Sequence, residues 1–332
     1  MTAIDPGFAR KARDAAAAAS VYPAPMIRSV MNGRDWAILG ALALIWGGAF
    51  FFINVAVHHV PPLTYVLLRL SIAAAAMWAM LWWRGETLKL PRQAWSAILL
   101  LALLNNALPF TLFGWAQTHI ASGLASILNA TTPIWGVIVA HLFTADERIT
   151  PRKLAGVLLG FSGVALMIGP GLIGRIGDSG VLAELACVSA ALAYALAGVW
   201  ARRFKAMGVS PFSVTTGQLT AGAVMMLPLA LIGDHPWTMA WPPLGAWAAI
   251  VTLALLCTAL GYVLYFKLID SSGATNALLV TLLVPPTAIV LGVLFLGEVI
   301  APFDFAGLAL IAIGLAAIDG RLLARVSRLM PA

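Results

Sequence analysis

The chain has 332 residues, of which 61% are hydrophobic and 10% are charged, and its formal net charge is +7. Soluble domains contain roughly 45–50% apolar and about 25% charged residues, so this composition excludes an ordinary soluble protein. Apolar stretches of about 20 residues, each long enough to cross a hydrocarbon layer of roughly 30 Å, recur between short polar breaks. We therefore expect an integral membrane protein in contact with the lipid bilayer, and we assign the positive charge to membrane topology rather than to nucleic-acid binding.

The polar segment before the first apolar stretch, residues 1–35, shows no continuous apolar core followed by a small-residue cleavage site. We expect a cytoplasmic N-terminal arm rather than a removable signal peptide. Its alanine run at 15–19, flanked by basic residues, fits either a disordered arm or a helix lying on anionic lipid.

Ten apolar stretches follow in chain order. They lie at 36–57, 62–83, 94–115, 121–143, 152–169, 181–201, 211–232, 245–266, 273–296 and 303–318. Backbone groups in lipid must be hydrogen-bonded internally, and continuous hydrophobicity without strict alternation favours helices over the strands of a barrel. The predicted fold class is an all-α integral membrane protein with ten transmembrane helices.

The basic residues are distributed unevenly over the breaks between these stretches. Of the 20 Lys and Arg residues, 18 fall in the N-terminal arm, in alternate breaks, or in the basic tail at 319–332. By the positive-inside rule, both termini are then cytoplasmic, which requires an even number of spans. We expect a multi-pass protein of the cytoplasmic (inner) membrane.

The sequence repeats itself at a nearly constant spacing. "ITPRKLAG" at 149–156 is echoed by "IAPFDFAG" at 300–307, and "LLNNALP" at 103–109 is echoed by "LLCTALG" at 255–261, with offsets of 151 and 152 residues. Matching offsets of this size indicate an internal repeat.

The repeat predicts a first five-helix unit at 36–169, a glycine-rich linker at 170–180, and a second five-helix unit at 181–318. Because five is odd, the second unit enters the membrane from the opposite side. The result is an inverted-topology repeat, an architecture that secondary transporters use for alternating access.

Two stretches also carry a family resemblance. "LIWGGAFFFINVAVHHVPPLTYVLLRLSIAAAAM" at 44–77 combines a Trp-Gly-Gly, paired prolines and an arginine seven residues after the second proline. "ASGLASILNATTPIWGVIVAHLFTADERITPRKLAGVLLGFSGVALM" at 121–167 has a proline in the fourth predicted helix and a glutamate before the fifth. Over residues 36–318 the chain resembles EamA-type proteins of the drug/metabolite transporter superfamily. This resemblance implies a ten-helix exporter with a central cavity between the halves, and amino acids and related metabolites as frequent cargo.

Two predicted spans combine an asparagine with a proline four residues later. Pro109 has no N–H, so the carbonyl of Asn105 loses its helical partner, and Pro133 does the same to the carbonyl of Asn129. An amide and a freed carbonyl then occur at one depth, where they must face protein or water. They either line a transporter cavity or join neighbouring helices, and the sequence leaves both readings open.

Arg69 is the only basic residue deep inside a predicted span. Its burial costs at least about 2.5–3.5 kcal/mol, so it should face the bundle and have a partner. That partner is either a set of freed carbonyls or the carboxylate of a substrate, and Glu184 is the nearest acidic candidate. Because the resembled family usually has arginine at this place, Arg69 says little about which substrate is carried.

Aromatic and amide side chains complete the candidate cavity. Trp46 and Tyr194 fall mid-span at matching places in the two units, where they could stack on an aromatic or hydrophobic substrate group. Gln218 is the counterpart of Arg69, and Thr258 is the counterpart of Asn106. The predicted cavity residues are Trp46, Asn54, Arg69, Asn105, Asn106, Asn129, Tyr194, Gln218, Thr258, Tyr262 and Asn276.

Other motifs predict no cofactor and no metal site. The GxGxxG match at 169–174 follows a membrane span rather than a strand, and no GxxxxGK[ST] occurs, so nucleotide binding and an ATP-driven pump are not supported. Cys187 and Cys257 both fall inside spans and form no zinc or disulfide pattern. A GxxxG at Gly156 and Gly160 fits either packing within one molecule or a homodimer, and both remain open.

The predicted function is a secondary exporter of small metabolites, with neutral and aromatic amino acids favoured and nucleosides, vitamins or drugs as alternatives. An integral membrane enzyme would need an acid, a base or a metal within mutual reach, whereas the carboxylates and histidines here lie at span ends or in loops. A channel or membrane scaffold is the other class that stays open. The same lack of deep carboxylates favours export driven by the substrate gradient or only weakly by protons.

Overall fold

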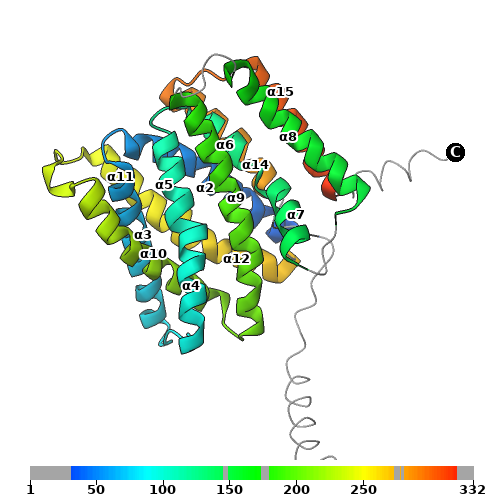
Figure 1. The fold of residues 1–332 in the computed structure, drawn as a ribbon. Coiled ribbons are helices and arrows are strands. Elements are labelled where there is room, and N and C mark those ends of the chain that lie inside the picture. Colours follow the sequence, from blue (N-terminus) through cyan, green and yellow to red (C-terminus); the bar gives the residue numbers. More distant parts are fainter. Residues whose placement is uncertain (1–30, 145–148, 173–178, 273–276, 278–279, 320–332) are drawn as a thin grey trace, which may run out of the picture.

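The computed structural model describes residues 31–144, 149–172, 179–272, 277 and 280–319, and Figure 1 draws the remainder as a grey trace. The predictions made for residues 1–30, for Asn276 and for the tail at 320–332 lie outside the described residues. Within the described ranges the chain forms helices joined by turns and bends, and contains no strand.

The helices follow one another closely along the chain. They are α2 (Gly33–Val57), α3 (Pro62–Trp83), η1 (Arg92–Ala94), α4 (Trp95–Ala102), η2 (Leu103–Ala107), α5 (Leu108–Ala116), α6 (Ser122–Asn129), α7 (Thr132–Phe143), α8 (Pro151–Leu172), α9 (Ser179–Ala206), α10 (Pro211–Gly233), η3 (Pro236–Thr238), α11 (Leu244–Thr252), η4 (Leu253–Leu260), α12 (Gly261–Ser272), α14 (Val280–Leu291), η5 (Gly292–Leu296) and α15 (Pro302–Asp319). Several of them continue each other without a break in direction, as α4, η2 and α5 do from Arg92 to Ala116. We call α2 to α8 the first half and α9 to α15 the second half.

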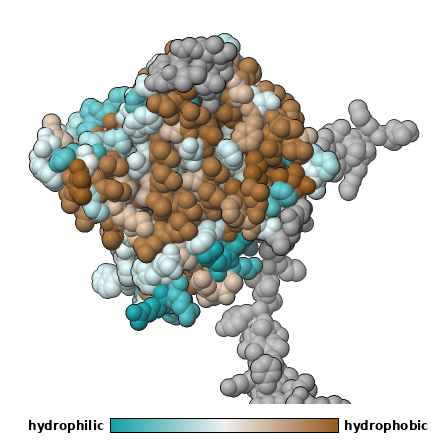
Figure 2. Space-filling view, viewed as in Figure 1, coloured by the Kyte–Doolittle hydropathy of each residue, from teal (hydrophilic) through white to brown (hydrophobic). Residues whose placement is uncertain are grey.

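The outer surface of the bundle is apolar. Seven helical segments of the described chain are long and apolar enough to cross a membrane, and two shorter apolar helices lie at Leu283–Leu296 and Pro302–Ile318. Figure 2 shows hydrophobic side chains over the visible face of the bundle and hydrophilic ones gathered at its lower end. Large side chains such as Leu44, Leu158 and Phe295 are exposed on this surface, as expected where lipid is the solvent. The structure confirms an all-helical integral membrane protein.

The two halves pack in a matched way. α2 contacts α14 and the rod formed by α11, η4 and α12, and α9 correspondingly contacts α7 and the rod formed by η2 and α5. α3 and α10 pack directly on each other, and so do α8 and α15, which run side by side along one edge of the bundle in Figure 1. The main contacts between the halves are therefore repeated with the roles of the halves exchanged.

Glycines allow the close approach of α8 and α15. A Cβ built on Gly156 would lie 2.5 Å from the carbonyl oxygen of Gly314, and a Cβ on Gly314 would lie 2.5 Å from the carbonyl oxygen of Gly156. Gly160 packs against Ile134 of α7 in the same way. The GxxxG of the fifth predicted span is thus occupied within the molecule, in the manner of small residues at helix interfaces in membranes.

The bundle has two chemically different ends. The first holds a surface cavity of about 320 Å³ lined by Asn54, His58, Gln117, Thr118, His119, Ile120, Ala121, Leu296 and Glu298, and we call it the cavity end. The opposite end, the basic end, carries the Lys and Arg residues of the described chain other than Arg69, namely Arg34, Arg84, Lys89, Arg92, Arg152, Lys153, Arg202, Arg203, Lys205 and Lys267. At the basic end, Asp35 accepts hydrogen bonds from the Asn32 amide (3.1 Å) and the Ser271 hydroxyl (2.7 Å), which ties the start of α2 to the end of α12.

Candidate functional site

Two π-helical segments lie at corresponding places in the two halves. η2, of five residues, lies in the middle of the third predicted span, and η4, of eight residues, lies in the middle of the eighth. Pro109 lies two residues after the end of η2 and cannot donate a backbone hydrogen bond, which accounts for the wider turn in the first half. Gly261 stands in the corresponding place after η4, so a similar backbone form arises there without a proline. Such π-bulges occur frequently at functional sites.

Arg69 lies beside the second of these segments. The guanidinium Nε donates to the Thr258 hydroxyl (2.9 Å), NH1 lies 3.4 Å from the Tyr65 hydroxyl, and the carbon of the guanidinium sits 3.7 Å from the centroid of the Phe110 ring. Thr258 in turn donates to the Leu253 carbonyl (2.8 Å), which the wide turn of η4 leaves accessible. Arg69 is 5% exposed, and none of its partners in the described chain is a carboxylate.

The two asparagines of η2 bond to side chains of the second half. Asn105 Nδ2 donates to Gln218 Oε1 and to the Tyr262 hydroxyl, both at 3.0 Å. Asn106 Nδ2 donates to Gln218 Oε1 (3.2 Å), and the Tyr262 hydroxyl donates to Asn106 Oδ1 (3.1 Å). Asn106 and Gln218 are fully or almost fully buried, whereas Asn105 and Tyr262 are half-buried. We call Arg69, Asn105, Asn106, Gln218, Thr258 and Tyr262 the polar cluster.

Trp46 borders this cluster. Its indole Nε1 donates to the Cys257 carbonyl (3.1 Å), and its ring centroid lies 5.2 Å from that of Tyr265. The Cys257 thiol donates to the Ile45 carbonyl (3.2 Å), so α2 is fastened to η4 at two neighbouring points. Tyr194 lies instead against Phe113, with stacked rings 6.2 Å apart. The structure thus gives Trp46 and Tyr194 different aromatic partners.

Two predicted cavity residues lie apart from the polar cluster. The carbonyl of Asn129 that Pro133 frees accepts a hydrogen bond from the Thr132 hydroxyl (2.7 Å), so it is satisfied locally at the junction of α6 and α7. Asn54 lies near the end of α2, where it lines the cavity with Gln117 and Glu298. Within the described residues, no hydrogen bond or ring contact joins either side chain to the polar cluster, and Asn276 lies outside those residues.

Comparison with known proteins identifies the fold family. A sequence model of the EamA-like transporter family matches residues 35–169 and, separately, residues 181–318. The chain belongs to this family. It is a multi-pass membrane transporter.

Relatives of this EamA-like transporter cover most of its length. The uncharacterized transporter YoaV of Bacillus subtilis is 26% identical over 276 residues, which is 83% of this chain and 93% of YoaV. A probable terminal-alkyne amino-acid exporter of Streptantibioticus cattleyicolor is 30% identical over 214 residues, 64% of this chain and 69% of the relative. The inner membrane transporter YedA of Escherichia coli is 26% identical over 279 residues, 82% of this chain and 86% of YedA. A solved crystal structure with 22% sequence identity superposes with a TM-score of 0.63 over 89% of this chain and 99% of the other, which supports the fold.

Two residues of this EamA-like transporter that hold Arg69 were not predicted. Tyr65 is completely buried, lies one turn before Arg69 on α3, and its hydroxyl reaches the Phe110 carbonyl at 3.4 Å. Phe110 supplies the ring face under the guanidinium. In a sequence, a tyrosine or phenylalanine within an apolar helix indicates core packing, so only the spacing of four residues between Tyr65 and Arg69 could have drawn attention to the first of them.

No group of three or more His, Cys, Asp or Glu side chains that could hold a metal ion occurs among the described residues. The chemistry available in the polar cluster is therefore hydrogen bonding by amides and hydroxyls together with one positive charge. These groups can bind and orient a polar molecule, and they contain no nucleophile paired with a base.

Proposed function

We propose that this EamA-like transporter exports small metabolites, in particular neutral and aromatic amino acids, across the cytoplasmic membrane by alternating access. The polar cluster is the proposed binding site. Arg69 would bind the carboxylate, the amides of Asn105 and Gln218 would meet the ammonium group, and Trp46 and Tyr262 would flank the side chain. The probable amino-acid exporter among the relatives supports this substrate class.

One observation carries the proposal, namely a buried guanidinium whose partners in the described chain are all neutral. Placing an arginine within the bilayer costs at least about 2.5–3.5 kcal/mol. The Thr258 hydroxyl and the Phe110 ring return part of this cost, and the contact with Tyr65 is too long to add much, but none of the three carries a negative charge. A carboxylate brought by the substrate would offset the remainder, because charge-assisted pairs are the strongest hydrogen bonds available.

The position of the cluster supports alternating access. Arg69 and the asparagines come from the first half, and Thr258, Gln218 and Tyr262 come from the second. Movement of one half against the other would therefore change the site directly. Together with the two family matches and the exchanged helix contacts, this supports two five-helix repeats of inverted topology, ten spans in all, with the basic end in the cytoplasm.

Nucleosides, vitamins or drugs are the second substrate group, because amides and aromatic rings also suit their rings. Most of these molecules lack the carboxylate that Arg69 would bind. The presence or absence of that single group on the transported molecule separates the two substrate classes.

Counterflow in proteoliposomes tests the proposal with a panel that contains phenylalanine, leucine, phenylalanine amide, phenethylamine and a nucleoside. We expect the two amino acids to exchange and the amide and amine to exchange at least about tenfold more slowly, since the ion pair they lack contributes about 1.5–3 kcal/mol. Arg69→Gln should remove this preference, and Asn106→Leu should weaken exchange of the amino acids.

Arg84→Gln is the matched control, because Arg84 pairs with Glu86 at the protein surface and lies outside the polar cluster. Its preference for carboxylates should equal that of the unmodified protein. Nucleoside exchange without amino-acid exchange, or an unchanged carboxylate preference in a folded Arg69→Gln protein, would contradict the assignment of Arg69.

A further inference from the structure

Two carboxylates at the cavity end belong to the second half but cap helices of the first half. Glu298, in the connection between η5 and α15, accepts hydrogen bonds from the backbone amides of Ser122 (2.6 Å) and Gly123 (3.0 Å) at the start of α6. Asp234, after the end of α10, accepts from the backbone amide of Thr64 (2.6 Å) at the start of α3. Both contacts therefore cross from one half to the other.

Neither capped helix provides a cap of its own. The residues before α3 and α6 are Pro61 and Ala121, and neither forms a side-chain capping bond. The first amides of a helix have no partner within the helix, and they carry the positive end of its dipole. A carboxylate from elsewhere is consequently the group that satisfies them here, and losing it would leave those amides to water.

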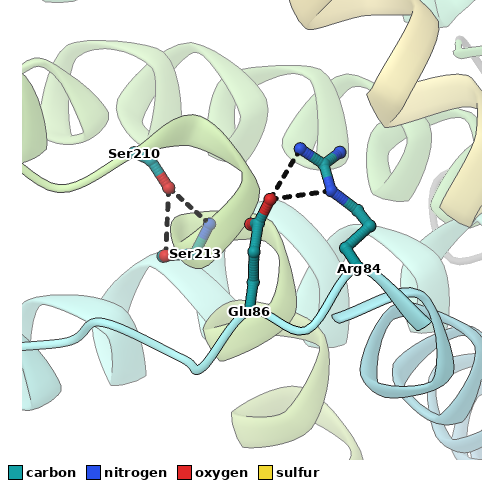
Figure 3. Close-up of polar contacts among 4 residues, drawn as sticks. All are labelled: Arg84, Glu86, Ser210 and Ser213. Atoms are coloured by element: carbon teal, nitrogen blue, oxygen red, sulfur yellow. Dashed lines mark hydrogen bonds and ion pairs between the residues drawn. The ribbon is translucent and has the colours of Figure 1, made fainter. Parts of the chain in front are cut away.

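At the basic end, the counterparts of Asp234 and of the start of α3 are bonded differently, as Figure 3 shows. α10, the counterpart of α3, is capped locally, because the Ser210 hydroxyl accepts from the backbone amide of Ser213 (3.1 Å). Glu86 follows α3 much as Asp234 follows α10, yet its carboxylate pairs with Arg84 (2.8 Å) two residues away in the same half. Glu86 and Ser210 thus make these bonds within their own halves, while Asp234 bonds to the other half.

The carboxylate of Glu298 lies close to the backbone of η5. A Cβ added to Gly292 would lie 2.9 Å from the Glu298 carboxyl carbon, so a larger residue there would displace the carboxylate. The hydroxyl of Ser122 and both polar side-chain atoms of Gln117 are buried nearby without a hydrogen-bond partner in the described chain. Buried polar atoms of this kind cost free energy that hydration would recover, so separation of the halves at this end is made easier by them.

We propose that Glu298 and Asp234 form a latch that holds the cavity end of the transporter closed, and that it releases when this end opens. On release, the two carboxylates leave the starts of α6 and α3, and water reaches the Gln117 amide and the Ser122 hydroxyl. Glu298 is the stronger member because it binds two amides. The latch rests on the alternating-access function proposed above. In it, the free-energy barrier to opening comes from breaking the hydrogen bonds between the carboxylates and the backbone amides, not from contacts within the polar cluster.

Labelling of a buried reporter tests the latch without any substrate. The native cysteines are first replaced, Cys187→Ala and Cys257→Ala, and Gln117→Cys is added, since Gln117 is 1% exposed beneath Glu298. A membrane-impermeant maleimide is applied to right-side-out and inside-out vesicles. His58→Cys in the same background, exposed at the cavity end, identifies which preparation presents that end to the reagent.

Glu298→Gln should raise the labelling rate of Gln117→Cys about fivefold or more, because glutamine keeps only one of the two acceptor oxygens and places no negative charge at the start of α6. Asp234→Asn should raise it less, and the two together should raise it most. Glu86→Gln is the matched control, an acid-to-amide change at the basic end that should leave the rate unchanged.

Ser122→Pro removes the latch from the opposite side. Proline is accepted at the first position of a helix, and the extended backbone of Ala121 suits a following proline, so α6 should still form. The variant keeps Glu298 but deletes one of its two donors, and its labelling rate should rise as that of Glu298→Gln does. The latch would be overturned if Glu298→Gln and Ser122→Pro labelled at the rate of the Glu86→Gln control, or if Glu298→Gln raised the rate and Ser122→Pro did not. A failure of the substrate panel would not change this labelling result, and a failure of the labelling experiment would not change the result of the substrate panel.

Discussion

η2 and η4, two of the three π-helical segments of the described chain, have a similar backbone form and different side chains. η2 presents two amides, Asn105 and Asn106, which bond to Gln218 and Tyr262. η4 presents Cys257 and Thr258, which bond to the Ile45 carbonyl and to Arg69. In both cases the polar groups of one half bond to the other half, so each break in a helix serves the contact between the halves.

The two halves share the backbone form of these segments and differ in the polar side chains on them. Packing requires a wide turn at the middle of each span, and both halves provide one. Binding requires particular charges and amides, and those differ, with a guanidinium in the first half where the second has the amide of Gln218. The proposed site would therefore hold its substrate in one orientation, although the scaffold around it is nearly symmetric.

The largest effect is expected from removing the Thr258 hydroxyl, which joins η4 to Arg69. Thr258→Val keeps the shape of the side chain but leaves Arg69 Nε without its 2.9 Å partner. Hydrogen bonds to charged groups contribute about 1.5–3 kcal/mol, so the apparent affinity for a carboxylate substrate should fall at least about tenfold. The concentration dependence of counterflow measures this change.

Thr252→Val is the control for that substitution. Thr252 lies earlier in the same span, at the end of α11 just before η4, and is half-buried. Its substitution should change the affinity little. If both valine variants changed the affinity equally, η4 would serve packing alone, and the Thr258 hydroxyl would have no part in binding.

The spans themselves could be predicted well from the sequence, because hydrophobic length is a strong signal in membranes. The predicted stretches at 94–115 and 211–232 correspond to helices at Arg92–Ala116 and Pro211–Gly233. Pro109 also predicted an irregular turn near the asparagines, and η2 lies there. The π-helical form of η4 was not predicted, since "LLCTALG" contains no proline.

Contacts between the halves could not be read from the sequence. Glu298 and Asp234 look like ordinary loop acids in the sequence, and only folding brings them to amides 170 or more positions away. Glu184 was the nearest acidic candidate for Arg69, whereas the folded chain gives the guanidinium Thr258, Tyr65 and Phe110. Hydropathy reports which residues are buried, but it does not report which partners they find.

A second effect, on stability, tests how closely aromatic rings pack against α5 and α12. A Cβ on Gly114 would lie 2.5 Å from Cε1 of Tyr65, and a Cβ on Gly261 would lie 2.6 Å from Nε1 of Trp46. Gly114→Ala and Gly261→Ala should each destabilise the fold by about 1–3 kcal/mol, because neighbouring rings must move. Thermal unfolding in detergent measures both.

Gly136→Ala is the matched control for the two glycine variants, since nothing lies within 4 Å of a Cβ at that position. Its stability should be unchanged or slightly higher, because alanine is the better helix former. A loss confined to one of the two variants would show that the ring beside the other glycine has room to move.

The smallest effect concerns the indole that fastens α2 to η4. Trp46→Phe removes the hydrogen bond from Nε1 to the Cys257 carbonyl (3.1 Å), and hydrogen bonds inside membrane bundles average about 0.6 kcal/mol. Trp135→Phe is the matched change, because the Trp135 Nε1 is buried and has no hydrogen-bond partner among the described residues. We expect Trp46→Phe to lower the midpoint of thermal unfolding slightly more than Trp135→Phe. Equal midpoints would mean that water satisfies the Cys257 carbonyl equally well. In that case η4 would hold α2 through the Cys257 thiol and packing alone.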